Sequence, residues 1–202
     1  MKAPLFYSKI LLFGEYGIIK NSKGLSIPYN FFKGGLKLGD FKNEIVKESN
    51  RNLINFKNYL KNIDSSIVEF DFIKLENDLK DGMFFDSSIP QGYGVGSSGA
   101  LVAALYDRYA LNKITVLENL TKPKILNLRN VFSKMESFFH GKSSGLDPLN
   151  SYLSLPILIH SQNEIETTGI PSQSSNGKGA VFLLDSGTSS ETAPMVELFF
   201  KS

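Results

Sequence analysis

The 202-residue sequence contains no cysteine, no tryptophan and only two histidines. Without cysteine the chain can form neither a disulfide framework nor a thiolate metal site, and it cannot use a cysteine nucleophile. The remaining composition is that of a globular protein, because 42% of the residues are hydrophobic and 21% are charged, which is enough apolar side chain to bury a core. We therefore expect one domain or two small ones.

The sequence also lacks an excess of one charge and any long apolar run. Its 22 basic and 20 acidic side chains leave a formal net charge of +2, whereas binding to nucleic acids or membrane surfaces usually shows as a concentrated basic excess. The apolar runs are far shorter than the ~20 residues that cross a bilayer, and Lys9 and Gly14 interrupt those near the N-terminus, so we expect no signal peptide. The resulting expectations are a small-molecule partner, no nucleic acid, no membrane and a cytoplasmic location.

Hydrophobic periodicity predicts a mixture of strands and helices. Apolar side chains at near-helical spacing predict an amphipathic helix or helix pair over residues 41–63, and a second helix that starts at Thr121 and ends at Gly141. Residues 25–40 fit strand and loop. The short apolar or alternating runs predict further strands at residues 9–13, at a segment that ends at Lys20, and at residues 68–73, 153–160 and 180–184.

The segment over residues 87–99 is the strongest local signal, with four glycines, four serines and a proline in thirteen residues. It leads into small, unbranched residues that favour a helix from Ala100 onward. Glycine permits positive φ and close approach of a ligand, and a helix N-terminus supplies free N–H groups and the positive end of a dipole. These features predict a phosphate-binding loop, in which one serine of the pair Ser97 and Ser98 caps the helix and the other faces a ligand or metal.

Other interpretations of this loop remain open at this point. Gly94, Gly96 and Gly99 fit the dinucleotide-binding fingerprint, but that motif needs a strand directly before it, and Pro90 is poorly suited to end a central strand. A Walker loop would end in Gly-Lys-Ser/Thr, and a protein kinase would need a later His-Arg-Asp segment, and both are missing. A plain flexible turn is the remaining alternative.

A second group of functional residue types lies near the end of the helix expected up to Gly141. Glu136 and His140 are four residues apart and therefore share a helix face. Gly141 and Gly145 allow the chain to fold back, so that Asp147 can approach both side chains. Two neighbouring carboxylates suggest a divalent cation and a general base. Taken singly, these residues also fit a solvated glutamate, a histidine at a helix C-terminus and a turn aspartate.

The loop resembles the phosphate-binding motif of the GHMP kinases, Pro-x-Gly-x-Gly-Leu-Gly-Ser-Ser-Ala, with Val95 in place of Leu and Gly99 in place of the first Ala. The stretch from Glu136 to Asp147 resembles the Glu-x-x-x-His-Gly-x-x-Ser-Gly-x-Asp signature of the mevalonate kinases in that family. Two further segments, around Lys9 and before Thr192, resemble family motifs in the same order. The chain departs from the family pattern at Tyr7-Ser8, at Tyr16 and at Glu191.

The resemblance implies a fold and an activity. The expected fold is an α/β (α+β) domain of the ribosomal protein S5 domain 2-like type, with a mixed sheet covered by helices over residues 1–202 and about residues 183–202 leading toward a C-terminal domain. The expected activity is ATP- and Mg²⁺-dependent phosphorylation of the primary hydroxyl of mevalonate, and we allow for a homodimer. The alternatives are a phosphomevalonate kinase, a diphosphomevalonate decarboxylase, a galactokinase, a homoserine kinase, a dinucleotide-binding oxidoreductase and a non-catalytic binding module.

The resemblance also implies a role for each motif residue. Asp147 would accept the proton of the substrate hydroxyl, and Lys9 beside it would neutralise charge in the transition state. Mg²⁺ would be held by Ser98 and Glu136. The nucleotide phosphates would lie on Gly92, Tyr93, Gly94, Val95, Gly96, Ser97 and Ser98, and the substrate would contact Glu15, His140, Ser144 and Thr192.

Overall fold

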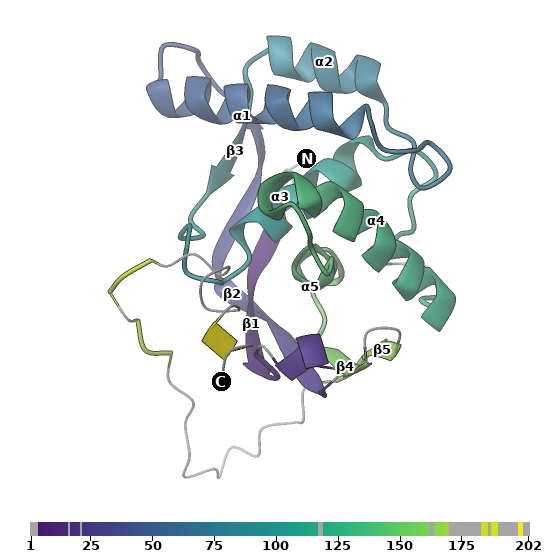
Figure 1. The fold of residues 1–202 in the computed structure, drawn as a ribbon. Coiled ribbons are helices and arrows are strands. Elements are labelled where there is room, and N and C mark those ends of the chain that lie inside the picture. Colours follow the sequence, from purple (N-terminus) through teal and green to yellow (C-terminus); the bar gives the residue numbers. More distant parts are fainter. Residues whose placement is uncertain are drawn as a thin grey trace.

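The computed structural model describes residues 4–15, 17–20, 22–116, 119–161, 164–169, 183–185, 187–189 and 198–199. Thr192 and most of the strand expected at residues 180–184 lie outside these ranges. The elements follow one another as β1 (Phe6–Phe13), η1 (Gly17–Lys20, a 3₁₀ helix), β2 (Gly24–Leu38), α1 (Glu44–Leu60), α2 (Phe72–Lys80), β3 (Met83–Ser87), α3 (Ser97–Tyr109), α4 (Lys122–His140), α5 (Leu146–Leu153), β4 (Ile157–Ser161) and β5 (Glu164–Thr167) (Figure 1).

The long strand β2 organises the sheet. One edge of β2 pairs with β1, and its other edge is shared by β4 near its beginning and by β3 at its end, while β5 pairs with β4. The predicted α/β class is confirmed, but every pairing among the described strands is antiparallel, so the expected mixed sheet is wrong for this part of the chain. Parallel neighbours need crossover connections, whereas β1 with β2 and β4 with β5 are joined by short links.

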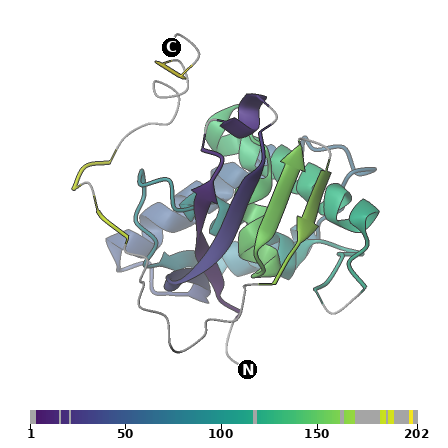
Figure 2. The ribbon, with the colours of Figure 1, turned by 90° about the horizontal axis from the view of Figure 1, so that it is seen from below.

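Helices α3, α4 and α5 form a layer on one face of the sheet. Figure 2 looks onto the strands and shows these helices behind them. Both α3 and α5 contact β1 and β2, and α4 packs on α3 and α5. The core between the layers contains fully buried side chains from several elements, including Phe132, Leu149 and Ile157. In the described part of the chain, no helix combines the length and the apolar character needed to cross a membrane.

Helix α1 confirms the amphipathic periodicity expected within residues 41–63. It begins at Glu44, where Asn43 caps it by accepting a hydrogen bond from the backbone N–H of Ile45 at 2.9 Å. Its buried face carries Asn50, whose Nδ2 donates to the carbonyl oxygens of Leu79 at 3.0 Å and Met83 at 2.7 Å. A buried amide that satisfies two carbonyl groups fixes α1 against the end of α2 and the start of β3.

Three sequence predictions about elements are wrong. Residues 68–73 form no strand: Phe70 makes one isolated bridge, and α2 begins two residues later with Asp71 as its cap. The segment that ends at Lys20 is the 3₁₀ helix η1 instead of a strand. The strand expected over residues 153–160 begins only at Ile157, because α5 occupies the residues up to Leu153.

Candidate active site

The glycine-rich loop takes the backbone conformation that its composition predicts. Gly92, Gly94 and Gly96 have φ values of 78°, 67° and 82°, which residues with a Cβ adopt only with strain. Gly96 is the N-cap of α3, and no side chain accepts a hydrogen bond there, so the expected serine cap is wrong. Among the described residues, the first N–H groups of α3 therefore have no side-chain acceptor, and the alternating turn and helix N-terminus together favour an anion.

Strand β1 holds this loop in place. The backbone N–H of Lys9 donates to the carbonyl oxygen of Val95 at 3.0 Å, and a Cβ on Gly96 would meet Cγ of Lys9 at 3.0 Å. Lys9 is only 7% exposed, which is rare for a lysine unless its charge is paired. The loop and this buried lysine are thus in direct contact, and their positions depend on each other.

The partner of Lys9 is Asp147 in the first turn of α5, with 3.1 Å between Nζ and Oδ1. Burial by itself would lower the pKa of Lys9, but the charge and hydrogen bond of Asp147, with smaller contributions from Glu15 and Glu136, outweigh burial and raise that pKa. Lys9 is therefore held in its charged form next to an aspartate and the glycine-rich loop. This confirms the expected proximity of Lys9 and Asp147.

Glu136 is a second buried carboxyl group, 3% exposed on the last turns of α4. Ser98 Oγ donates to its Oε1 at 3.1 Å, and Ser143 Oγ donates to its Oε2. Burial, and next the charge of Asp147, raise the pKa of Glu136 to about 7, although both serine hydrogen bonds and the charge of Lys9 act in the opposite direction. A nearby cation would stabilise the charged form of this buried carboxyl group.

The other predicted site residues lie at different distances from this centre. His140 Nε2 is 3.1 Å from Ser98 Oγ, so Glu136 and His140 do share a helix face and meet the same serine. Ser144 is exposed, and its Oγ accepts from the backbone N–H of Leu146 at 3.3 Å. Glu15 is exposed in the turn after β1, and Thr192 lies outside the described residues.

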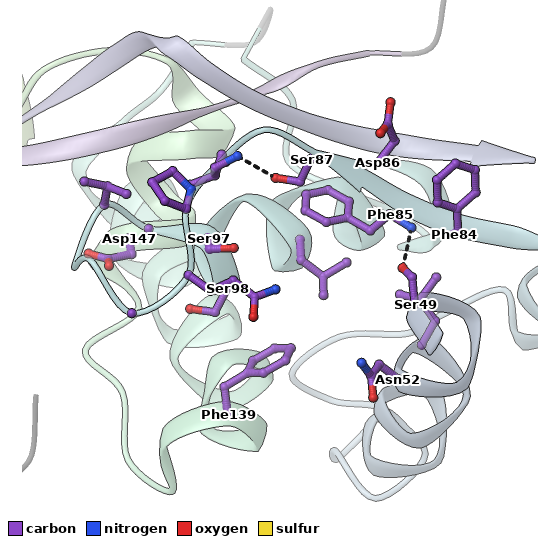
Figure 3. Close-up of a pocket in the computed structure, with 18 of the residues that line it drawn as sticks. Ser49, Asn52, Phe84, Phe85, Asp86, Ser87, Ser97, Ser98, Phe139 and Asp147 are labelled. Carbon is purple, nitrogen blue, oxygen red and sulfur yellow. Dashed lines mark hydrogen bonds between the residues drawn. The ribbon is translucent and has the colours of Figure 1, made fainter. Parts of the chain in front are cut away.

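A cavity of about 880 Å³ opens beside the glycine loop. It is bounded by α1, by β3, by the loop and by the end of α4, and every loop residue assigned to phosphate binding except Tyr93 lines it. Figure 3 shows Ser97, Ser98 and Asp147 at one side of this cavity, and Ser49, Asn52 and Phe85 at the other. Its volume lies in the range of pockets that enclose a nucleotide-sized ligand.

The sequence analysis missed the far wall of this cavity and one residue of its centre. Ser49 Oγ accepts from the backbone N–H of Phe85 at 2.9 Å and so joins α1 to β3, while Asn52 lines the cavity from the next turn of α1. No motif marks these positions, and only the helical period of α1 could have shown that they share a face. Ser143 was a spacer position between His140 and Ser144, although it contacts Glu136 directly.

No group of three or more metal-ligating His, Asp or Glu side chains occurs in the described ranges. Mg²⁺ does not need one, because it is commonly bound by one or two carboxylates together with substrate phosphates and water. Ser98 and Glu136, beside an anion-binding loop, therefore fit a magnesium–nucleotide complex. The fit depends on the phosphates to complete the coordination.

Comparison with known proteins gives a family match for part of the chain. Residues 58–154, from within α1 to just past α5, match the sequence model of the GHMP kinases N terminal domain. This region of the chain is therefore similar to the N-terminal domain of GHMP kinases. The matched region includes the glycine loop, Glu136 and Asp147, so the family resemblance of these two motifs is confirmed. No curated protein matches the chain in a direct search.

The chain is also similar to solved structures, and the first of these shows the fold. The chain is similar to L. major mevalonate kinase in complex with R-mevalonate, with a TM-score of 0.52 and 19% identity over 100% of this chain and 61% of that one. A mevalonate kinase of Methanococcus jannaschii matches with a TM-score of 0.48 and 19% identity over 83% of this chain and 55% of its own. The chain thus spans between about half and three fifths of these proteins.

Proposed function

We propose that this protein transfers the γ-phosphoryl group of ATP to the primary hydroxyl of mevalonate. The observation that carries the proposal is the Lys9–Asp147 ion pair of 3.1 Å, which lies directly against Gly96 of the phosphate-binding loop. An acid–base residue, a buried cation and an anion-binding loop at one point are the parts that phosphoryl transfer to a hydroxyl requires.

The two walls of the cavity indicate how a nucleotide would be oriented in it. The uncapped start of α3 and the loop of alternating left-handed glycines favour the phosphates at one side. The opposite wall combines the phenyl rings of Phe84 and Phe85 with the polar side chains of Ser49 and Asn52. Aromatic faces and an amide suit a purine base. We place the base against this wall and the terminal phosphate toward Asp147.

Ser98 and Glu136 would hold Mg²⁺ in this arrangement. Bound there, the ion would neutralise charge on the nucleotide phosphates. The raised pKa of Glu136, about 7, supports this role because it reflects a buried carboxyl group close to Asp147. Helix α4 holds Glu136 at the site, and the loop and α3 bring Ser98 to it, so both ligands come from ordered elements.

Asp147 would accept the proton of the substrate hydroxyl as the bond to phosphorus forms. Lys9 Nζ, which contacts Asp147 Oδ1, would stabilise the negative charge that spreads over the transferred group. Burial of Lys9 strengthens this effect, because charges interact more strongly where water is excluded. The positions of both side chains are fixed before the substrate arrives, which removes part of the entropic barrier.

The choice of mevalonate among GHMP substrates rests on the stretch from Glu136 to Asp147 and on the fold shared with L. major mevalonate kinase, which was solved with R-mevalonate. Phosphomevalonate, diphosphomevalonate, galactose and homoserine are the competing substrates. The conversion should be tested by measuring ADP release from ATP and Mg²⁺ with each of the five compounds. We expect release with mevalonate well above that with the other four.

A Lys9→Met variant gives the matched control, since it keeps the length of the side chain and removes its charge. It should bind ATP and release almost no ADP. Faster ADP release with another of the compounds would overturn the substrate assignment. Absence of both ATP binding and ADP release in the unmodified chain would overturn the kinase proposal itself.

A further inference from the structure

Ser143 lies in the short loop that connects α4 to α5, between two functional carboxylates. The loop follows His140, the last residue of α4, and ends at Gly145, the N-cap of α5. Glu136 lies before it and Asp147 after it. The family signature treats Ser143 as a spacer, but the structure gives its hydroxyl group two defined hydrogen bonds.

The direction of these hydrogen bonds follows from the chemistry of the partners. The backbone N–H of Gly145 donates to Ser143 Oγ at 3.0 Å, so the serine oxygen acts there as acceptor. The single hydroxyl proton is then donated to Oε2 of Glu136. Because Ser98 Oγ donates to Oε1 of the same carboxyl group at 3.1 Å, the two oxygens of Glu136 have different partners on different elements.

Helix α4 itself fixes the position of Ser143. Ser133 Oγ donates to the carbonyl oxygen of Ser143 at 2.6 Å, and Arg129 Nε donates to the carbonyl oxygen of Ser144 at 2.9 Å. Gly145 has a φ of 72°, and a Cβ there would meet the backbone of Arg129 and Ser133. The loop therefore lies directly on α4, one to two turns before Glu136.

We propose that Ser143 is a positioning residue for Glu136, which holds Oε2 so that only Oε1 is presented to a cation at Ser98. This inference rests on the proposed function, because the cation is the one that would accompany ATP. Mg²⁺ demands near-octahedral geometry, and a carboxylate that offers one oxygen suits it better than one that offers both. Hydrogen-bonded partners of metal-binding side chains typically contribute 10- to 100-fold to metal affinity.

The experiment measures metal binding directly. Mn²⁺ is titrated into the full chain, with a saturating non-hydrolysable ATP analogue, and the free ion is followed by electron paramagnetic resonance. We expect the Ser143→Ala variant to raise the Kd for Mn²⁺ by roughly 10- to 100-fold, and the Ser143→Thr variant, which keeps the hydroxyl, to restore most of the affinity. Binding of the analogue in EDTA should stay unchanged in both variants.

Ser137→Ala is the matched control. Ser137 is on the same helix next to Glu136, but its Oγ donates to the backbone carbonyl oxygen of Ser133 at 2.7 Å. This variant should bind Mn²⁺ as the unmodified chain does. In turnover assays, Ser143→Ala should raise the Mg²⁺ concentration for half-maximal rate and leave the rate at saturating Mg²⁺ nearly unchanged. A purely structural defect would lower the maximal rate instead.

The outcomes separate this inference from the proposed function. Equal Mn²⁺ affinity of Ser143→Ala and the unmodified chain would overturn the positioning role and leave the kinase proposal intact. An unmodified chain that binds neither the analogue nor Mn²⁺ would overturn both. If Ser143→Ala does not fold, as judged by circular dichroism, Ser143→Cys provides the same test, because a thiol of similar size is only a weak donor.

Discussion

Asp147 is half-buried in the first turn of α5, with Lys9 on one side, and its charge helps to raise the pKa of Glu136. We expect the Asp147→Asn variant to lower kcat by about 10²- to 10⁴-fold, the usual contribution of a general base. The amide keeps the shape of the side chain but does not accept the hydroxyl proton. Nucleotide affinity, measured by calorimetry, should change only a few-fold, because the loop is untouched.

Asp107→Asn is the control for this prediction. Asp107 on α3 forms an ion pair with Lys113 and does not line the cavity, so its substitution should leave kcat unchanged. A turnover of Asp147→Asn close to that of the unmodified chain would show that another group takes the proton.

Glu136 links the site to pH-dependent stability. Its pKa is raised from 4.5 to about 7, chiefly by burial, so between these pH values the native chain holds a proton that the unfolded chain has released. The free energy of unfolding should therefore fall as pH rises through this window. Glu136→Gln removes this dependence and should stabilise the metal-free protein at pH 8 by up to about 3 kcal/mol, since one pKa unit corresponds to about 1.4 kcal/mol.

Urea unfolding in EDTA at pH 5 and pH 8 measures this effect. The exposed Glu69 supplies the control, and Glu69→Gln should follow the unmodified chain at both pH values. A pH profile for Glu136→Gln identical to that of the unmodified chain would contradict the raised pKa.

At the scale of single residues, sequence analysis located the chemically distinctive members of the centre. Lys9, Ser98, Glu136, His140 and Asp147 stand at fixed spacings within recognisable motifs, and the structure brings them together. Sequence analysis could not locate Ser143, because serine is common and the importance of this one depends on how the loop after α4 lies on that helix.

At the scale of elements, long amphipathic periods were sufficient to predict a helix, but the patterns of short segments were not sufficient to predict their secondary structure. The pattern of Phe70, Asp71 and Phe72 alternates as in a half-buried strand, but the Asp71 side chain accepts a hydrogen bond from Lys74 N–H and starts α2. Tertiary contacts and helix capping decide whether such a short segment becomes a strand or a helix. Helix α5 was missed for a similar reason, because Pro148 suggested a turn, although proline is tolerated in the first turn of a helix.

The packing of α3 against α5 gives a prediction at this scale. A Cβ on Gly99 would lie 2.7 Å from the carbonyl carbon of Asp147 and 2.8 Å from the nitrogen of Pro148. Gly99→Ala should gain about 1 kcal/mol of helix propensity but force α5 and its aspartate away, with a net destabilisation of about 1–3 kcal/mol. A shift of Asp147 by even a fraction of an ångström should also lower kcat by about 10-fold or more.

Thermal unfolding measures the predicted loss of stability in Gly99→Ala, and steady-state kinetics measure the predicted loss of kcat. Gly169→Ala is the control, because nothing lies within 4 Å of an added Cβ at that glycine. Unchanged kcat and stability in Gly99→Ala would mean that α3 and α5 can separate without effect on the site.

At the scale of the whole molecule, the site draws on residues from β1 to α5, so ligand binding should stabilise the entire fold. A Mg²⁺ complex of a non-hydrolysable ATP analogue at 100 times its Kd should add about 2.7 kcal/mol. For a chain of this size each kcal/mol corresponds to about 2–4 °C, so Tm should rise by roughly 5–10 °C.

Differential scanning calorimetry measures this shift, and NAD⁺ at the same concentration serves as the control ligand. A rise with NAD⁺ and none with the ATP analogue would favour the dinucleotide interpretation of the glycine loop over the kinase one.

The bonds between β1 and α5 also affect how the protein is made. Ser151 Oγ donates to the carbonyl oxygen of Tyr7 across 144 positions of sequence, in addition to the ion pair of Lys9 with Asp147. A ribosome that adds 5–20 residues per second needs on the order of ten seconds to proceed from β1 to α5. During that time Lys9 lacks Asp147, its ion-pair partner in the folded chain. If the proposed function holds, catalytic competence arises late in biosynthesis, because a nascent chain that ends before Asp147 has the glycine loop without the proposed general base.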